Sequence, residues 1–381
     1  GGHFFESVGW ERAQWHESNA RLLEDYDVPG RDEWSARYWS KIEGAEHHAT
    51  RNNVALFDIS PFTKIRVTGP GALHFLNYLA ANQIDAPIGK VVYTAMLNHQ
   101  GGIMCDLTIT RLGENEFLVL TGGGVGMHDL AWIRQHVPQD GSVTVTDVTS
   151  SYGALGLWGP KARAVLQSVT ESDVSNAAFP YYTAQQLLVD YVPVLALRIS
   201  YAGELGWELY APGEYGLRLW DTLWEAGKAH GIIAAGGGAF DSLRLEKGYR
   251  LWGADIHSEY NPYEAGIGWA VKLNKGEFLG REALQQVKAT GIQRKLCCIT
   301  LDDPQAVVMG KEPIWGNGAV VGYVTSANYG YTVGRCIVYG YLPIEQSKAG
   351  TAVAVEYFGQ RLPATVCDEP LYDTKMENLK G

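Results

Sequence analysis

Cysteine is scarce in this sequence of 381 residues, and the five that occur do not form a disulfide pattern. They include one adjacent pair and no Cys-x-x-Cys motif, which is typical of reduced, buried thiols. No apolar run approaches the ~18 residues that a membrane-spanning helix needs, and no signal peptide precedes the opening residues "GGHFFESVGW". We therefore expect a reducing compartment and no membrane partner: the cytoplasm, or the mitochondrial matrix in a eukaryote.

Positive charge is also in short supply, since 31 lysines and arginines stand against 42 aspartates and glutamates, for a formal net charge of −11. A surface of this sign does not attract nucleic acid or an anionic membrane, so neither is expected as a partner. Charged residues make up only 19% of the chain and hydrophobic residues 46%. This composition indicates a globular protein with a large core.

Several chemical signatures are missing as well. No G-x-G-x-x-G opens a helix after an early strand, so the sequence shows no dinucleotide site of its own. The glycine runs at 122–126 and 236–238 lack the lysine and hydroxyl residue of a phosphate-binding loop. Neither a zinc-ligand spacing nor a nucleophile elbow is found. The sequence therefore predicts no metal site and no flavin or nicotinamide site within these residues.

The sequence divides into three stretches of different character. Residues 1–44 are rich in tryptophan and charge, and we interpret them as an arm packed on the rest of the chain or on something missing from it. Residues 45–285 alternate strand and helix patterns, for example in "TKIRVTGPGALHFLNYLA", which indicates an α+β region. Residues 290–381 contain short β segments with glycine and proline turns, the pattern of a small β-barrel or sandwich.

Asp106 is the first candidate for a chemical role. It follows "GGIMC" and opens "DLTIT", so a carboxylate stands where a glycine turn enters an alternating strand. One interpretation is a turn-capping aspartate, and the residue pattern alone favours it. The other is a carboxylate that projects into a cleft beside an imine or amine, where it stabilises a cation or relays a proton.

Two further carboxylates stand in "SYAGELGWELY", residues 200–210, which is otherwise written like the end of a buried strand. A carboxylate buried without partners costs roughly several kcal/mol, so Glu204 and Glu208 need hydrogen-bond donors. For Glu208 the donors could belong to a ligand with two parallel N–H groups, such as a guanidinium or the edge of a pterin. A salt bridge is the alternative, and the cations considered for it are Arg198, Arg244 and Arg250.

Several segments in the same order resemble the aminomethyltransferase (glycine-cleavage T-protein) superfamily. "RISYAGELGWELY" resembles its GYTGExGxE segment, "LNHQGGIMCDLTI" its GGIxDD strand, and "DSLRLEKGYRLWGADI" its LRLEAGxxLxGxDI segment. "VGYVTSANYGYTVG" is similar to the GxVTSG of its C-terminal barrel. "GWERAQWHESNA" and "EPLYDTKMENLKG" are most similar to the folate-dependent half of dimethylglycine oxidase and of dimethylglycine and sarcosine dehydrogenases. The resemblance covers essentially the whole chain.

The resemblance implies an α+β fold of three lobes around a tetrahydrofolate site, with a small C-terminal β-barrel. It implies that Glu208 grips the pterin ring and that Tyr201 packs near it. By the same resemblance, Asp106 lies beside the reactive folate nitrogens and assists closure of 5,10-methylenetetrahydrofolate. Tyr93 and Arg244 are weaker inferences and would line or brace the pocket.

This sequence also departs from the family pattern. Phe240 stands where many T-proteins have arginine, and Cys105 replaces the first aspartate of the GGIxDD strand. Both changes follow the amine-oxidase branch and weaken the case for a lipoyl-carrier partner. "EKGYRLWG" differs from the KGCYxGQE of the related iron–sulfur assembly factors, which argues against that role. Glu204 is expected to be a turn residue of the motif with a lesser role.

We therefore expect a module that takes the one-carbon unit released when dimethylglycine or sarcosine is oxidatively demethylated, and transfers it to tetrahydrofolate. The FAD for that oxidation would lie on a missing N-terminal region or a partner chain, with residues 1–44 as the seam. Two alternatives stay open. One is a stand-alone aminomethyltransferase or demethylase, and the other is a folate-binding scaffold protein without turnover.

Overall fold

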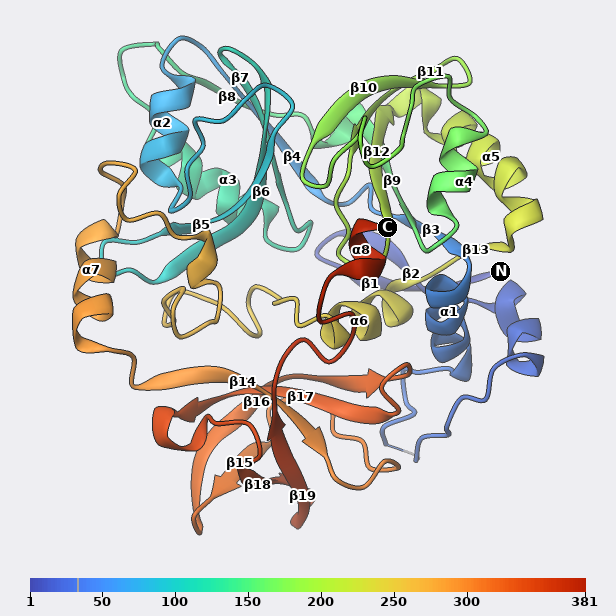
Figure 1. The fold of residues 1–381 in the computed structure, drawn as a ribbon, viewed down its shortest axis with the longest axis vertical. Helices are drawn as coiled ribbons and strands as arrows, with labels where there is room; N and C mark the ends of the chain where they lie inside the picture. The colour runs from blue at the N-terminus through green and yellow to red at the C-terminus, as the bar shows by residue number, and fades with distance from the viewer. Residues whose placement is uncertain (33) are drawn as a thin grey trace.

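The computed structural model describes residues 1–32 and 34–381, arranged in three lobes (Figure 1). Residue 33, in the predicted N-terminal arm 1–44, lies outside the described residues. Two lobes contain open β-sheets covered by helices, and the third is a closed barrel. Helices α1 and α6 and the C-terminal tail lie where the lobes meet. The prediction of an α+β fold with a small C-terminal barrel is confirmed.

The first lobe is an antiparallel sheet of five strands in the order β5-β6-β7-β4-β8. In β6, buried side chains alternate with half-buried ones, so Cys105 and Leu107 face the core while Asp106 faces the opposite side. Helices α2 and α3 pack on the core face. The bounds are β4 Thr63–Thr68, α2 Ala72–Leu79, β5 Val91–Leu97, β6 Ile103–Gly113, β7 Glu116–Thr121, α3 Gly126–Gln135 and β8 Thr144–Asp147.

The second lobe is a sheet of six strands in the order β10-β11-β12-β9-β3-β13, antiparallel except where β13 pairs with β3. Strand β12 is buried on both faces. Its Trp207 packs with α4 and α5, whereas Tyr210 on the other face packs with Leu118 and Leu120 of the first lobe. Glu208, on the same face as Tyr210, therefore faces the first lobe. The bounds are β3 Val54–Asp58, β9 Tyr152–Trp158, α4 Ala162–Gln167, β10 Ala184–Val189, β11 Val192–Leu197, β12 Gly206–Pro212, α5 Gly216–Gly227 and β13 Ile232–Ala234.

The third lobe is a closed barrel of six strands in the order β14-β17-β16-β15-β18-β19. Closure removes the free sheet edges that short strands would otherwise expose. Helix α6 (Gly237–Glu246) and an irregular segment lead to α7 (Arg281–Thr290), which precedes the barrel. The barrel strands are β14 Arg294–Leu301, β15 Pro313–Gly316, β16 Ala319–Gly330, β17 Arg335–Pro343, β18 Ala352–Tyr357 and β19 Gln360–Cys367.

The N-terminal residues form a hairpin, β1 (Gly2–Ser7) and β2 (Trp10–His16), before helix α1 (Lys41–Asn52). Trp15 is buried and stacks on His3. Trp39 donates a hydrogen bond to the Tyr331 hydroxyl of the barrel at 2.8 Å. Trp34 stays 53% exposed, with its ring edge against an exposed phenylalanine. The tryptophans of this stretch therefore differ in burial, from the buried Trp15 to the exposed Trp34.

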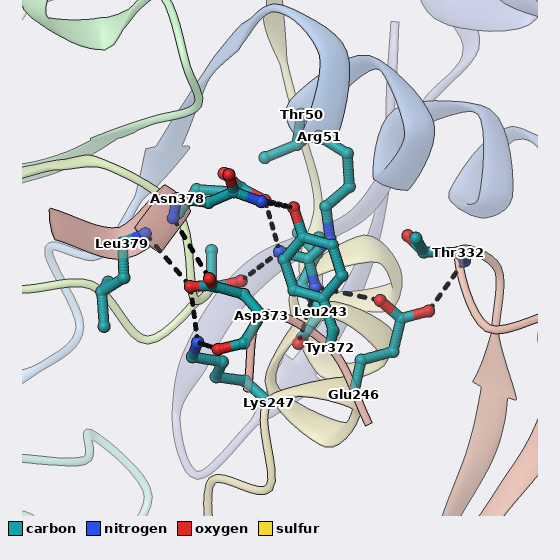
Figure 2. A network of polar contacts seen from close by, with 12 residues as sticks. Thr50, Arg51, Leu243, Glu246, Lys247, Thr332, Tyr372, Asp373, Asn378 and Leu379 are labelled. Atoms are coloured by element: carbon teal, nitrogen blue, oxygen red, sulfur yellow. Dashed lines mark hydrogen bonds and ion pairs between the residues drawn. The ribbon is translucent and has the colours of Figure 1, made fainter. Parts of the chain in front are cut away.

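After the barrel, the chain returns to the junction of the lobes and ends in the short helix α8 (Glu377–Lys380) (Figure 1). At this junction Arg51 of α1 pairs with Glu204 at 2.8 Å and with Glu246 of α6 at 3.0 Å. The ring of Tyr372, from the tail, lies 3.7 Å from the Arg51 guanidinium (Figure 2). One buried cation thus joins four segments that are distant in sequence. No helix in residues 1–32 and 34–381 has the length and apolarity to span a membrane.

Replacing Arg51 by methionine is expected to lower the free energy of unfolding by about 3–5 kcal/mol, because two buried carboxylates lose their shared cation. Urea unfolding at pH 7.5 measures the change. The matched control is Arg66→Met, which breaks a surface pair whose side chains are 49% and 35% exposed, and should cost less than about 1 kcal/mol. Equal losses in the two variants would contradict the structural role of Arg51.

Candidate functional site

Strands β5 and β6 bring a tyrosine and an aspartate together on the face of the first sheet that does not carry its core. The Tyr93 hydroxyl donates a hydrogen bond to Oδ2 of Asp106 at 3.2 Å. The Tyr93 ring also stacks on Trp269, with the centroids 5.3 Å apart. Both Tyr93 and Asp106 are half-buried. Asp106 is therefore held by another strand and does not merely cap its own turn.

Asp106 has a perturbed acidity. Burial raises its pKa to about 7, the negative charge of Asp129 adds to the rise, and the hydrogen bond from Tyr93 opposes it. A carboxyl group with a pKa near neutrality can both release and accept a proton at physiological pH. This is the property that a proton relay beside an amine or imine requires.

A second cluster lies behind Asp106, on the core side of the sheet. Asp129 accepts hydrogen bonds from the Thr121 hydroxyl at 2.5 Å, from the Cys105 thiol, and from His128 at 2.9 Å. Ligand atoms of Cys105, His128 and Asp129 all lie within 4.8 Å of one another. Sequence reasoning missed this cluster, because no short spacing links β6 to α3. Its mutual hydrogen bonds account for the arrangement.

Tyr201 reaches the same region from the turn that joins β11 to β12. Its hydroxyl donates to the carbonyl oxygen of Arg250 at 2.6 Å, and its ring packs on Phe240 and Tyr249. Burial raises the pKa of Tyr201. The charge of Arg244 lowers this pKa, and the charge of Asp106 raises it further. Beside burial, the negative charge of Asp106 raises the pKa of both Tyr93 and Tyr201, which indicates that these three predicted residues lie near one another.

Glu208 occupies a separate part of the junction between the first two lobes. It is only 5% exposed, and one carboxylate oxygen accepts a hydrogen bond from the Tyr210 hydroxyl at 2.6 Å. Burial raises the pKa of Glu208 to about 7, against the hydrogen bond from Tyr210 and the charge of Lys64. The Lys64 ammonium group itself donates to two backbone carbonyl oxygens.

The salt-bridge alternative for Glu208 is not what the structure shows. Within residues 1–32 and 34–381, Glu208 forms no ion pair, and the three arginines considered for it bind elsewhere. Arg198 donates to the backbone carbonyl of Phe179, and Arg250 pairs with Glu369. Apart from the bond from Tyr210, the carboxylate oxygens of Glu208 therefore have free lone pairs that no other described side chain occupies.

Arg244 contacts residues that support the site and is engaged by them. Its guanidinium pairs with Asp241 and with Asp255, each at 2.9 Å, and donates to the Ser326 hydroxyl of β16 at 3.1 Å. These contacts join α6 to the barrel. The guanidinium of Arg244 is thus already engaged by groups of the protein.

Glu204 has a larger structural role than the sequence suggested. Its partners are Arg51 and the Tyr372 hydroxyl, at 2.8 and 2.6 Å. Glu204 lies in the turn before β12, as expected, and its buried carboxylate relies on these two donors. Arg51 lies 153 residues away in sequence, and no local pattern could have indicated the pairing.

A cavity of about 350 Å³ lies between the N-terminal hairpin and the second lobe. Arg12 and Asp58 line it, together with aromatic side chains that include Phe57 and Phe240. Phe240 also contacts Tyr201, so one side chain separates the cavity from the tyrosine. Phe240 is the residue at which this sequence differs from the arginine of many T-proteins.

Two family descriptions match the chain along its length. The GCVT N-terminal domain matches residues 1–275, and the glycine cleavage T-protein C-terminal barrel domain matches residues 294–373. The chain belongs to the glycine cleavage T-protein family. The solved aminomethyltransferase T of the glycine cleavage system from Bartonella henselae superposes on this family member with a TM-score of 0.84 at 26% identity, covering 98% of this chain and 95% of that one.

Relatives of this T-protein family member include longer enzymes. Human mitochondrial dimethylglycine dehydrogenase is 38% identical over 97% of this chain, but the match covers only 42% of the dehydrogenase. The aminomethyltransferase of Halothermothrix orenii is 36% identical over 89% of this chain and 92% of its own length. The chain is therefore an aminomethyltransferase-like domain that spans less than half the length of the dehydrogenase it resembles.

The raised pKa of Glu208 predicts a pH dependence of stability. Between about pH 4.5 and 7 the folded state keeps a proton on Glu208 that the unfolded state releases, so this group's contribution to stability falls as the pH rises through that window. Glu208→Gln lacks this titration. The free energy of unfolding of the variant should therefore rise relative to wild type by about 1–3 kcal/mol from pH 4.5 to pH 8.

Urea unfolding of both proteins at a series of pH values measures this difference. Other groups that titrate in the same range cancel, because both proteins contain them. A difference that stays constant from pH 4.5 to pH 8 would show that Glu208 titrates alike in the folded and unfolded states.

Proposed function

We propose that this chain is a tetrahydrofolate-dependent one-carbon transfer module. It captures the iminium or formaldehyde unit from oxidative N-demethylation of dimethylglycine- or sarcosine-type amines and forms 5,10-methylenetetrahydrofolate. The single observation that carries the proposal is the meeting of Tyr93, Asp106 and Tyr201 around a carboxyl group with a pKa of about 7. Membership of the aminomethyltransferase family supports a folate-dependent enzymatic role.

The residues present fit a reduced pterin. Glu208 is a buried carboxylate without a paired cation among the described residues, and its free lone pairs suit adjacent N–H donors. Tyr201 offers an aromatic face beside Phe240 and Tyr249. Tetrahydrofolate, when bound, supplies the nucleophilic nitrogens that accept the one-carbon unit. In this assignment Glu208 orients the ring and Tyr201 packs near it.

Asp106 would hold and move the proton. Its Oδ2 accepts from the Tyr93 hydroxyl, so the carboxyl group has a fixed orientation in both protonation states. At neutral pH the ionised form stabilises a nearby cationic carbon or nitrogen, and the protonated form returns a proton to a departing amine. Holding nucleophile and electrophile together removes a large part of the entropic barrier, which makes positioning the main contribution of the protein.

The oxidation step requires a flavin that we place outside these residues, on a further region of a longer polypeptide or on a partner subunit. The size of the human dehydrogenase supports this arrangement, since the chain matches only 42% of it. The exposed Trp34 is a feature that a flavin region would cover, and the cavity beside Phe240 is a second site at which such a region could dock.

A stand-alone aminomethyltransferase or demethylase is the second candidate. The observation in its favour is that the chain covers 92% of the Halothermothrix orenii aminomethyltransferase. Flavin that copurifies with the native complex separates the oxidase-linked module from this alternative. Formation of 5,10-methylenetetrahydrofolate from tetrahydrofolate and formaldehyde separates either enzyme from a folate-binding scaffold. A calorimetric titration with 5-formyltetrahydrofolate first establishes whether the site lies in this chain alone.

Glu208→Gln should weaken the binding of 5-formyltetrahydrofolate by roughly 1.5–3 kcal/mol, because the charge-assisted hydrogen bonds lose their charge. Calorimetry at pH 8, above the pKa of Glu208, gives the largest contrast. Glu225→Gln, on the exposed face of α5, is the matched control and should bind as wild type does. Unchanged affinity in Glu208→Gln would remove Glu208 from the binding site.

Asp106→Ala should reduce the rate of methylene transfer much more than folate affinity, because Asp106 is proposed to transfer a proton and not to bind the pterin ring. Loss of a general acid–base group typically lowers kcat about 10²–10⁴-fold. Single-turnover formation of 5,10-methylenetetrahydrofolate measures the rate, and calorimetry measures the affinity. Asp221→Ala, at an exposed position of α5, serves as control. If rate and affinity fall together, Asp106 is a binding group only.

A further inference from the structure

The C-terminal tail, residues 368–381, leaves the barrel and runs back to the turn that carries Tyr201 (Figure 1). We call residues 198–205 the Tyr201 turn. Of the described tail residues, several hydrogen-bond to groups within or directly beside this turn. The tail contains the segment "EPLYDTKMENLKG", which resembles the amine-oxidising branch. None of the site roles proposed above involves it.

The tail first contacts the residue on which Tyr201 rests. Glu369 binds Arg250 through both carboxylate oxygens, at 2.7 and 2.9 Å. The backbone carbonyl of Arg250 accepts the hydrogen bond of the Tyr201 hydroxyl at 2.6 Å. The guanidinium of Arg250 is buried and Glu369 is partly exposed, and the two parallel hydrogen bonds make this pair a directional contact. The position of the Tyr201 hydroxyl therefore depends on a residue held by the tail.

Tyr372 makes the second contact, with the turn itself. Its hydroxyl donates to Oε1 of Glu204 at 2.6 Å, and Arg51 donates to the same oxygen at 2.8 Å. Arg51 also donates to the carbonyl of Ala202 at 2.9 Å. Figure 2 shows the ring of Tyr372 lying over the Arg51 guanidinium, so one tail residue contacts both Glu204 and its cation.

Asp373 makes the third contact. The ammonium group of Lys247 donates to its carbonyl oxygen and to Oδ2, both at 2.7 Å. Asp373 is fixed in turn by the backbone amides of Asn378 and Leu379 (Figure 2). The stem of Lys247 lies against Gly203, where an added Cβ would stand 2.9 Å from its Cγ. Gly203 also has a φ of +75°, which favours glycine. The backbone of the turn therefore contacts the Lys247 side chain directly, with no Cβ between them.

From these contacts we propose that Tyr372 and Asp373 are positioning residues that hold the Tyr201 turn in the geometry that binds tetrahydrofolate. The inference rests on the proposed function and adds to it a coupling between the tail and the site. A ligand that needs the ordered turn also stabilises the tail contacts, because coupling between two equilibria is reciprocal. Folate binding and closure of the tail therefore favour each other.

Hydrogen exchange on the wild-type chain tests the coupling without any substitution. Saturating 5-formyltetrahydrofolate should slow exchange of the amides of residues 371–379, although none of them is assigned a contact with the ligand. Amides of the barrel strands β18 and β19 provide the internal reference and should not change. Protection confined to the Tyr201 turn and strand β12, with none in the tail, would overturn the inference.

Tyr372→Phe removes the hydroxyl and keeps the ring on Arg51. We expect 5-formyltetrahydrofolate to bind about three- to tenfold more weakly, because part of the lost charge-assisted hydrogen bond is transmitted to the turn. The KM for folate should rise by a similar factor while kcat stays near wild type, since Asp106 and Tyr93 are untouched. The matched control is Tyr323→Phe, which removes a barrel hydroxyl bonded to Tyr260 at 3.0 Å.

Each outcome bears on a different claim. Wild-type chain that fails to bind 5-formyltetrahydrofolate contradicts the proposed function, and the inference falls with it. Tight binding by wild type, with Tyr372→Phe matching Tyr323→Phe in affinity and KM, contradicts the positioning role alone. Asp373→Asn, which loses the charge opposite Lys247, should reproduce the affinity loss of Tyr372→Phe and provides a second variant if the first is unstable.

Discussion

The structure depends on a buried guanidinium that serves two carboxylates. Arg51 pairs with Glu204 and Glu246, all three nearly excluded from solvent. Ionised groups in such an environment are tolerated only when charge and hydrogen bonds are matched together. Glu246 meets this condition, because it also faces His47 at 3.4 Å and accepts from two backbone amides of the barrel. Against burial, His47 and then Arg51 lower its pKa to about 2. The first helix, the second lobe and the barrel therefore share one electrostatic centre.

The buried carboxylates differ in how far nearby positive charge compensates them. Glu246 is compensated on every side and titrates far below neutrality, whereas Glu208 and Asp106 both have a pKa near 7. Burial is the leading cause for both of the latter groups, and neither forms an ion pair within the described chain. Perturbed groups of this kind gather at functional sites because their protonation can change during a reaction. Arg51, Arg244 and Arg250 pair with carboxylates, whereas Glu208 and Asp106 have no paired cation among the described residues.

Local pattern was enough to predict much of the fold. Residues 106–110 were predicted as an alternating strand and lie in β6, and the short β segments after residue 290 indicated a barrel or sandwich, which proves to be a closed barrel. The partners of Glu204 could not be predicted in this way, because Arg51 and Tyr372 come from distant elements and are unremarkable where they stand. The cluster around Asp129 was missed for the same reason. Periodicity reports which face of a strand is buried, but it contains no information on which remote side chain arrives there.

The return of the tail has a consequence for the order in which the protein matures. Tyr372 is synthesised 168 residues after Glu204, a delay of roughly ten to thirty seconds at about 5–20 residues per second. During that interval the first two lobes can collapse on the ribosome, while Glu204 has only Arg51 as a donor. The two carboxylate contacts of the tail, from Tyr372 to Glu204 and from Asp373 to Lys247, can therefore form only after the barrel strands have been translated.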